Sequence, residues 1–207
     1  MTIRLIIAAF LALLFVGQAA TASGVGSAFG CLTTAQALGQ GRGNFGGGVG
    51  IADATSVFGT FTYGLSKYTD GRIRLGFRDD VDAELTFGAD FKWQFWNIGE
   101  GRREPLDMAL GGFFEYVDVG NFSVFQFGGQ LFASYPFRLN RGGTLSPYGR
   151  FNTRMESYSG GGASDTELEF GLNAGVAWQA TPAVAFYSEF QLDGNDGLFV
   201  GIDFNIM

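Results

Sequence analysis

Short segments in which apolar and polar residues alternate run from about Phe45 to the end of the chain. The clearest one lies between Val81 and Ile98. Because successive residues of a β-strand point to opposite sides, one face of this segment is apolar and aromatic and the other is polar. The apolar face carries Ala83, Leu85, Phe87, Ala89, Phe91, Trp93 and Phe95, and the polar face carries Asp82, Glu84, Thr86, Gly88, Asp90, Lys92 and Gln94. The pattern predicts strands with two chemically opposite faces.

Ten segments of this kind are separated by sequences rich in Gly, Asp, Asn and Pro, which are typical of turns. Most of them reach the length of about 9–11 residues that a tilted strand needs to cross a bilayer. We therefore predict an all-β fold with ten strands, with eight strands as the alternative. The predicted strands are residues 43–52, 55–65, 71–79, 81–97, 106–118, 121–136, 144–158, 166–179, 182–192 and 197–206.

Large aromatic residues are not spread evenly along these strands. An even number of strands places both ends of the chain on the same side of a barrel, and a periplasmic start makes every second strand end at the periplasmic rim. Aromatic residues on the apolar face gather near those ends, where a membrane barrel carries its interfacial girdle. The predicted girdle consists of Tyr63, Trp93, Phe95, Tyr135, Phe137 and Trp178.

The first 22 residues have the features of a signal peptide. Arg4 supplies a positive charge, Leu5 to Val16 form an apolar run, and Ala20-Thr21-Ala22 matches a signal peptidase site. The apolar run of roughly 12 residues is short for a membrane-spanning helix, which needs about 20. We predict cleavage near Ala22, a Gly-rich periplasmic lead-in over residues 23–42 that can tuck into the barrel mouth, and a barrel over residues 43–207.

Composition excludes several classes of site. The net charge of −7 argues against nucleic acid as a partner, because phosphate binding needs clustered Lys and Arg. Cys31 is the single cysteine, so the chain has no intrachain disulfide, and histidine is absent. We predict no catalytic, cofactor or metal site.

Three stretches resemble small outer-membrane β-barrel proteins of Gram-negative bacteria. Residues 63–77 and 180–190 are similar to their strand, periplasmic turn and strand units. Residues 201–206 are similar to the terminal Gly-x-x-apolar-x-apolar signal read by the barrel assembly machinery, with Gly201, Phe204 and Ile206 at the defining positions. The resemblance implies a closed antiparallel transmembrane barrel in the outer membrane, with lipid and the assembly machinery as partners.

In such a barrel the polar faces of the strands point into the lumen. Unpaired charges are costly in a narrow lumen, so we expect paired Arg and carboxylate groups in a hydrogen-bonded network. The candidate network consists of Arg72, Arg74, Asp90, Lys92, Glu115, Arg150, Arg154, Glu156, Glu169 and Glu189. This network either fills and holds the barrel or lines a narrow path for small solutes or ions.

The functional expectation is a non-enzymatic outer-membrane barrel, structural or acting as a narrow, low-conductance pore. The known barrel enzymes of the outer membrane depend on a histidine, so the resemblance carries none of their chemistry to this chain. The alternative is a secreted soluble β-barrel that turns its apolar face inward and binds an apolar ligand. The inferred outer connections are very short, which leaves little surface for a partner outside.

Overall fold

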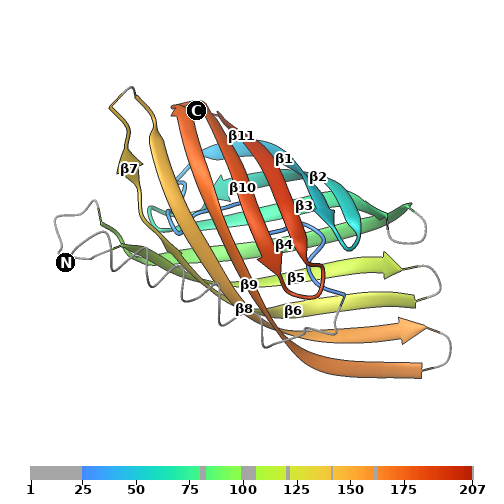
Figure 1. Cartoon of the computed structure of the whole chain (residues 1–207). Coiled ribbons are helices and arrows are strands. Elements are labelled where there is room, and N and C mark those ends of the chain that lie inside the picture. The colour runs from blue at the N-terminus through green and yellow to red at the C-terminus, as the bar shows by residue number, and fades with distance from the viewer. Residues whose placement is uncertain are drawn as a thin grey trace.

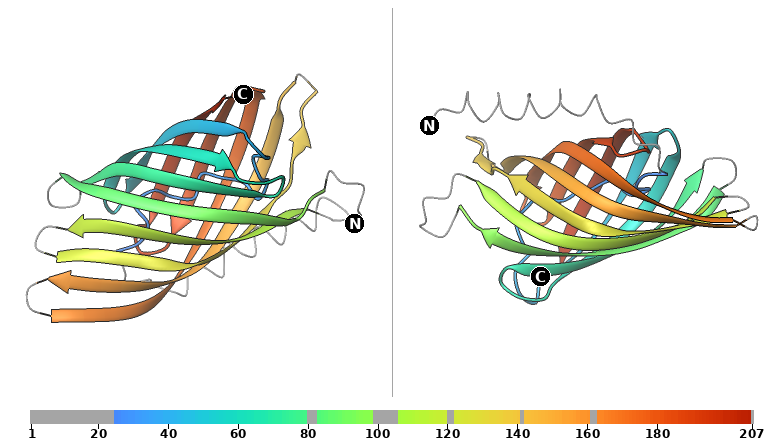
Figure 2. Two further views of the ribbon diagram at one scale, coloured as in Figure 1. Left: turned by 180° about the vertical axis from the view of Figure 1, so that it is seen from behind. Right: turned by 90° about the horizontal axis from the view of Figure 1, so that it is seen from below.

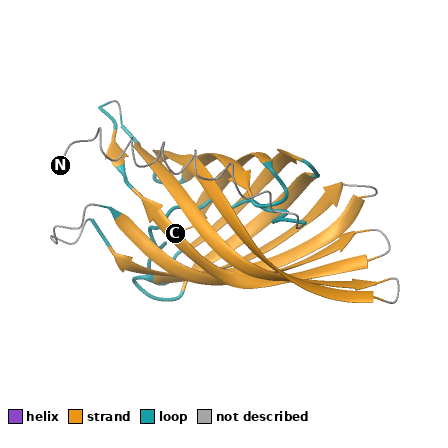
Figure 3. Ribbon diagram, turned by 60° about the horizontal axis from the view of Figure 1, so that its bottom comes forward, coloured by secondary structure: helices purple, strands orange, loops and turns teal. Residues whose placement is uncertain are grey.

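The structure is a computed structural model that describes residues 25–79, 83–98, 106–119, 122–140, 142–160 and 163–206. The predicted signal peptide, its cleavage site near Ala22 and the first two residues of the lead-in lie outside the described residues. Among the described residues, no helix is long and apolar enough to cross a membrane. Figure 3 shows this part of the chain as strands joined by loops.

Eleven strands are present in the described part of the chain (Figure 1). Their bounds lie within three residues of the predicted ones, apart from β7, which was not predicted. The strands are β1 (Gly43–Ala52), β2 (Thr55–Gly64), β3 (Thr69–Asp79), β4 (Ala83–Trp96), β5 (Asp107–Val119), β6 (Phe122–Ser134), β7 (Phe137–Arg138), β8 (Thr144–Gly160), β9 (Ala163–Thr181), β10 (Val184–Leu192) and β11 (Gly197–Ile206).

Ten of these strands close into an antiparallel barrel. Each strand pairs with the next along the chain, β1 pairs with β11 over their full lengths, and β6 pairs with β8. The short β7 pairs with the start of β8 and lies outside this ring of ten. The predicted fold class and strand number are confirmed, and closure leaves no open edge in the ring of ten strands.

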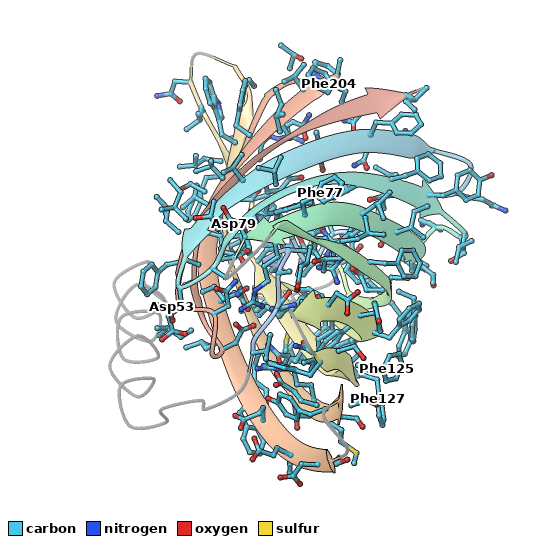
Figure 4. The ribbon with its side chains drawn as sticks, turned by 90° about the vertical axis from the view of Figure 1, so that its right-hand side faces the viewer. Asp53, Phe77, Asp79, Phe125, Phe127 and Phe204 are labelled. Carbon is cyan, nitrogen blue, oxygen red and sulfur yellow. The ribbon has the colours of Figure 1, made fainter. Side chains whose placement is uncertain are left out.

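The two faces of the barrel wall have opposite chemistry. In β3, Arg72, Arg74 and Arg78 are buried, while the intervening Ile73 and Leu75 are 53% and 55% exposed on the outside. Alternate residues follow the same rule along most of the wall, and Figure 4 shows Phe77, Phe125, Phe127 and Phe204 among the outward residues. The exception is the distal part of β9, where residues 165–168 are all exposed. Apolar side chains therefore cover most of the outside of the barrel. The inside holds the polar and charged side chains, together with buried apolar ones such as Phe58 and Phe199.

The two ends of the barrel differ in their connections. We call the end where β1 begins and β11 ends the terminus end, and the opposite end the distal end. Strands at the distal end are joined by two to four residues, at 53–54, 80–82, 120–121, 161–162 and 193–196. The terminus end carries the longer connections, 97–106 and 135–143, and the second of these contains β7 (Figure 1). The distal end thus has little loop surface, as the sequence predicted.

The outward face can be tested at Phe87, which is 39% exposed and pairs with Leu75 of β3. Replacing Phe87 by Arg places a charge on the apolar surface and should cost about 2–4 kcal/mol near the bilayer midplane. The free energy of folding into lipid vesicles, measured by urea titration, checks this. The adjacent Thr86 is buried and its hydroxyl has no hydrogen-bond partner among the described residues, so Thr86→Ala is the matched control. Equal losses in the two variants would contradict the assignment of faces.

Candidate functional site: the occupied lumen

Residues 25–38, here called the luminal segment, run through the inside of the barrel (Figure 2). Val25 lies at the distal end, where it contacts Glu156 near the end of β8. Leu38 lies at the terminus end, where it contacts Asp70 at the start of β3. The sequence predicted a periplasmic lead-in that can tuck into the barrel mouth. The structure instead places these residues along the whole lumen, because wall side chains bind their main chain.

At the distal end, wall side chains bind both the N–H groups and the carbonyls of the luminal segment. Glu156 accepts a hydrogen bond from the Val25 N–H at 2.9 Å, and Glu115 accepts one from the Ala28 N–H at 3.3 Å. Arg78 donates to the Val25 carbonyl at 2.9 Å. Amide side chains complete this level, with Gln126 donating to Gly26 and both Gln191 and Asn195 donating to the Ser27 carbonyl. The main chain here is held by charge-assisted bonds, which are stronger than bonds between neutral groups.

In the middle of the lumen, the carboxylate of Glu189 accepts hydrogen bonds from two consecutive N–H groups of the luminal segment. Its two oxygens accept from Cys31 at 2.6 Å and from Leu32 at 2.9 Å. The same carboxylate accepts the Tyr148 hydroxyl at 2.7 Å and the Asn173 amide at 2.6 Å. Four donors therefore surround a carboxylate that is 1% exposed, which compensates for its removal from water.

The backbone is bent around Glu189. Gly30 has a φ of 62° and Leu32 has a φ of 39°, in the left-handed region that costs a non-glycine residue about 1–3 kcal/mol. This bend turns successive N–H groups toward one point and so forms an anion-binding nest. Arg72 and Arg74 hold the other side of the bend, donating to the Cys31 carbonyl at 2.7 Å and the Gly30 carbonyl at 3.1 Å.

Toward the terminus end, Lys92 binds the luminal segment as a three-way donor. Its ammonium group donates to the Thr34 carbonyl at 2.8 Å, the Gln36 carbonyl at 2.9 Å and the Thr33 hydroxyl at 3.1 Å. N–H groups of the segment bind wall acceptors at the same level, Ala35 to Ser134, Ala37 to Gln94 and Leu38 to Asp70. A cavity of about 410 Å³ lies beside this level, lined in part by Thr34, Gln36 and Tyr187.

Two side chains of the luminal segment fill shaped spaces in the wall. Phe29 is 1% exposed and meets the ring of Phe58 edge-on at 5.4 Å, with the guanidinium of Arg74 at 4.9 Å from its ring centre. Leu32 lies over two wall glycines, because a Cβ added at Gly48 or Gly201 would come within 2.9 or 2.8 Å of its Cδ1 atom. Gly201, predicted as part of the assembly signal, therefore also makes room for the luminal segment.

Nine of the ten predicted network residues are buried in the lumen, and the structure pairs most of them. Asp90 accepts from Arg72 at 2.9 Å and lies 3.3 Å from Arg74, which also bridges to Glu115 at 3.0 Å. A second group lies nearer β8, where Arg154 binds Glu156 at 2.6 Å and Arg150 binds Asn173 at 2.8 Å. Glu189 is connected to Arg150 of this second group through Asn173, which donates to Glu189 and accepts from Arg150.

One predicted member is less buried than the others, and the network includes residues that were not in the predicted set, among them Asp70, Arg78 and Asp193. Glu169 is partly exposed on β9, where the long β8–β9 hairpin rises toward the distal end. Asp193, which the sequence placed in a hairpin turn, is buried and lies 3.6 Å from Arg150. Its carbonyl also accepts a hydrogen bond from Arg154. Burial of a turn carboxylate depends on barrel closure, and no local sequence signal reports it.

The predicted girdle residues lie near the terminus end of their strands. Tyr63, Trp93 and Trp178 are 46%, 50% and 45% exposed on the outer face. Tyr135 and Phe137 are partly exposed, with their ring centres 4.6 Å apart, and Phe95 lies beside Trp93 at 6.0 Å. Phe204 and Ile206 of the predicted assembly signal also point outward, 51% and 43% exposed. The interfacial and assembly roles of these residues remain predictions.

Comparisons with known proteins add little to this geometry. No protein-family model and no curated protein matches the chain. Among solved structures, the N-terminal β-barrel domain of Pseudomonas aeruginosa OprF is 12% identical, covering 81% of this chain and 99% of that chain with a TM-score of 0.38. A designed transmembrane β-barrel is 14% identical, covering 83% and 100% with a TM-score of 0.41. A mutant porin of Rh. blastica is 10% identical, covering 80% and 98% with a TM-score of 0.19. Similarities at these scores carry no argument about function.

The contribution of Glu189 to holding the luminal segment can be measured through the labelling rate of Cys31, the single cysteine, which is 1% exposed. Glu189→Gln replaces charge-assisted bonds by neutral ones, a loss of about 1–2 kcal/mol. We expect a maleimide to label Cys31 of the folded variant about ten-fold faster than the wild-type protein. Glu167→Gln, at an exposed position of β9, is the matched control and should label at the wild-type rate. Equal rates for all three proteins would contradict the role of Glu189.

Asp193 predicts a specific pH dependence. It lies in the turn after β10, and burial raises its pKa from 3.8 to about 6, although Arg154 and Arg150 act in the opposite direction. The folded protein therefore holds this proton more tightly than the unfolded chain does. The stability contributed by this group is present below a pH of about 4 and is lost as the pH rises through about 6. Urea unfolding in detergent between these values should show this loss in the wild-type protein and not in Asp193→Asn. Parallel pH profiles for the two proteins would refute it.

Proposed function

We propose that this protein is a non-enzymatic outer-membrane β-barrel whose lumen is kept closed by its own luminal segment, and that it conducts only narrowly when this segment moves. The observation that carries the proposal is the pairing of an apolar outer surface with a lumen filled by residues 25–38. The outer surface supports a membrane location, and the filled lumen supports a closed resting state.

The outer surface supports the membrane location because of its extent. Large apolar residues with at least a third of their surface exposed occur on every strand of the barrel wall. Soluble monomers rarely expose contiguous apolar patches of more than a few hundred Å². A closed barrel satisfies all of its wall hydrogen bonds internally, which is the requirement for a β-structure in lipid. Lipid is therefore the partner that this surface fits.

The lumen supports a closed state through its burial. Ala28, Phe29, Cys31 and Ala35 of the luminal segment are each at most 1% exposed. These residues lie between the distal level at Glu156 and the terminus-end level at Asp70. A solute path along the barrel axis would have to displace them. The charge network supports the same state, since it binds the luminal segment as well as the wall.

The alternative of a soluble barrel with an apolar interior is not supported. The interior holds buried Arg, Lys, Asp and Glu side chains, and the apolar face is on the outside. The absence of histidine supports a non-enzymatic role, since the barrel chemistry known to depend on that residue has no candidate here. The remaining choice lies between a purely structural barrel and a gated narrow pore.

Recordings in planar bilayers test the proposal. We expect the purified full-length protein to be silent or to show rare, small openings. A Glu115→Gln/Glu189→Gln variant weakens the hydrogen bonds to the N–H groups of Ala28, Cys31 and Leu32. This variant should open often. Glu167→Gln should behave as the wild-type protein does. Large, steady conductance steps from the unmodified protein would overturn the closed-lumen proposal.

The terminal strand offers a separate test of assembly. If residues 201–206 act as the assembly signal, Phe204→Ser should lower the amount of heat-modifiable barrel recovered from outer membranes. Phe204 faces outward and makes no lumen contact, so folding of the purified variant in detergent should change little. Normal recovery in cells would remove the proposed role of Phe204.

A further inference from the structure

The lumen recognises the luminal segment in two independent ways, through its main chain and through its side chains. The main-chain part uses carboxylates for N–H groups and Arg, Lys or amide side chains for carbonyls. Glu189, for example, takes the N–H groups of Cys31 and Leu32, while Arg72 takes the Cys31 carbonyl. Bonds of this type go to main-chain groups that every peptide carries, so by themselves they do not select a side-chain sequence.

The side-chain part is selective, and it begins with two glycines. Gly26 has a φ of 70°, and a Cβ there would stand 2.2 Å from the main-chain nitrogen of Asn195. Gly30 has a φ of 62°, and a Cβ there would stand 2.9 Å from the ring of Phe199. Neither position tolerates a side chain without movement of the wall. The lumen therefore rejects most peptides at these two positions.

Two further positions require large apolar side chains. The space around Phe29 is formed by Phe58 and the guanidinium of Arg74, and a Cβ added at Gly88 would come within 3.1 Å of the Phe29 ring. Leu32 occupies the space left by the missing side chains of Gly48 and Gly201. Small residues lie between these positions. The selected pattern over residues 26–32 is Gly-x-x-Phe-Gly-x-Leu.

We propose that the lumen is a sequence-selective binding site for a peptide of this pattern, and that residues 25–38 are its exchangeable occupant in the resting protein. The segment is joined to the wall through residues 39–42, of which Gln40, Gly41 and Arg42 are exposed. All other contacts described here are noncovalent. A free peptide of the same pattern can therefore take the site when the chain's own segment is released.

This inference deepens the proposed function, because it concerns the same lumen. Its test reads peptide binding in detergent and does not depend on conductance, so the two can fail separately. A recognition sequence for a site-specific protease is inserted between Gln40 and Gly41 of the full-length protein. After folding, cleavage leaves the luminal segment held only by its contacts. A fluorescent synthetic peptide with the sequence of residues 25–38 is then added in large excess, and its incorporation is followed by gel filtration and anisotropy.

We expect saturable incorporation of one peptide per barrel. Unlabelled peptides carrying Phe29→Ala or Gly30→Val should compete at least about ten-fold more weakly than the parent peptide. A peptide carrying Thr34→Ala is the matched control and should compete equally, because Thr34 binds Lys92 through its main-chain carbonyl and its side chain borders a cavity. Uncleaved protein should take up no peptide on the same timescale.

Three results would overturn the proposal. Equal competition by all peptides, including a scrambled one, would show that the lumen is not selective. Loss of the cleaved segment without uptake of the parent peptide would show that the lumen is not a peptide site. A cleaved segment that stays bound against the excess peptide would show that it is a fixed part of the fold rather than an exchangeable occupant.

Discussion

The bond between buried wall carboxylates and the main-chain N–H groups of the luminal segment is the interaction on which the rest of this structure depends. Glu189, Glu115 and Glu156 each hold at least one such group, and each is at most 1% exposed. Without the segment, three buried carboxylates would lose donors inside the barrel. Without the carboxylates, the N–H groups of the segment would be buried without partners. Each group therefore offsets the cost of burying the other away from water.

This dependence explains why the lumen mixes both signs of charge. A main chain presents donors and acceptors in turn, so a wall that binds it needs both anionic acceptors and cationic donors. The ion pairs between Arg72 and Asp90 and between Arg74 and Glu115 serve the wall and the segment together, because both guanidinium groups also bind segment carbonyls. A ring of one sign, as in an ion-selective pore, would leave half of the main-chain groups unsatisfied.

The wall was predictable from the sequence because its apolar outer face and its polar inner face take alternate residues. In β3 and β4, this alternation is almost uninterrupted, and the predicted bounds agree closely with the observed ones. The inward position of Glu189 was predictable for the same reason. Its partners were not, since a period of two identifies the face of a residue and says nothing about what fills the space opposite.

The luminal segment was not predictable as an occupant of the lumen for a related reason. Its main chain is bound by side chains from many strands, so it needs no alternation of its own, and its Gly, Ser and Thr residues are typical of a loop. The signal that could have found it is the unusual placement of Phe29 and Leu32 among small residues. Asp193 escaped prediction because its burial follows from closure of β10 and β11 around the segment.

Hydrogen exchange at the luminal segment of the full-length protein in detergent tests the central claim most directly. The amides of Ala28, Cys31, Leu32 and Leu38 are bonded to wall side chains from the distal to the terminus end. These amides should exchange as slowly as amides of the flanking strand β1, while the amide of the exposed Gln40 should exchange fast. Fast exchange throughout residues 25–42, at the rate of an unstructured tail, would show that the lumen is not closed by this segment.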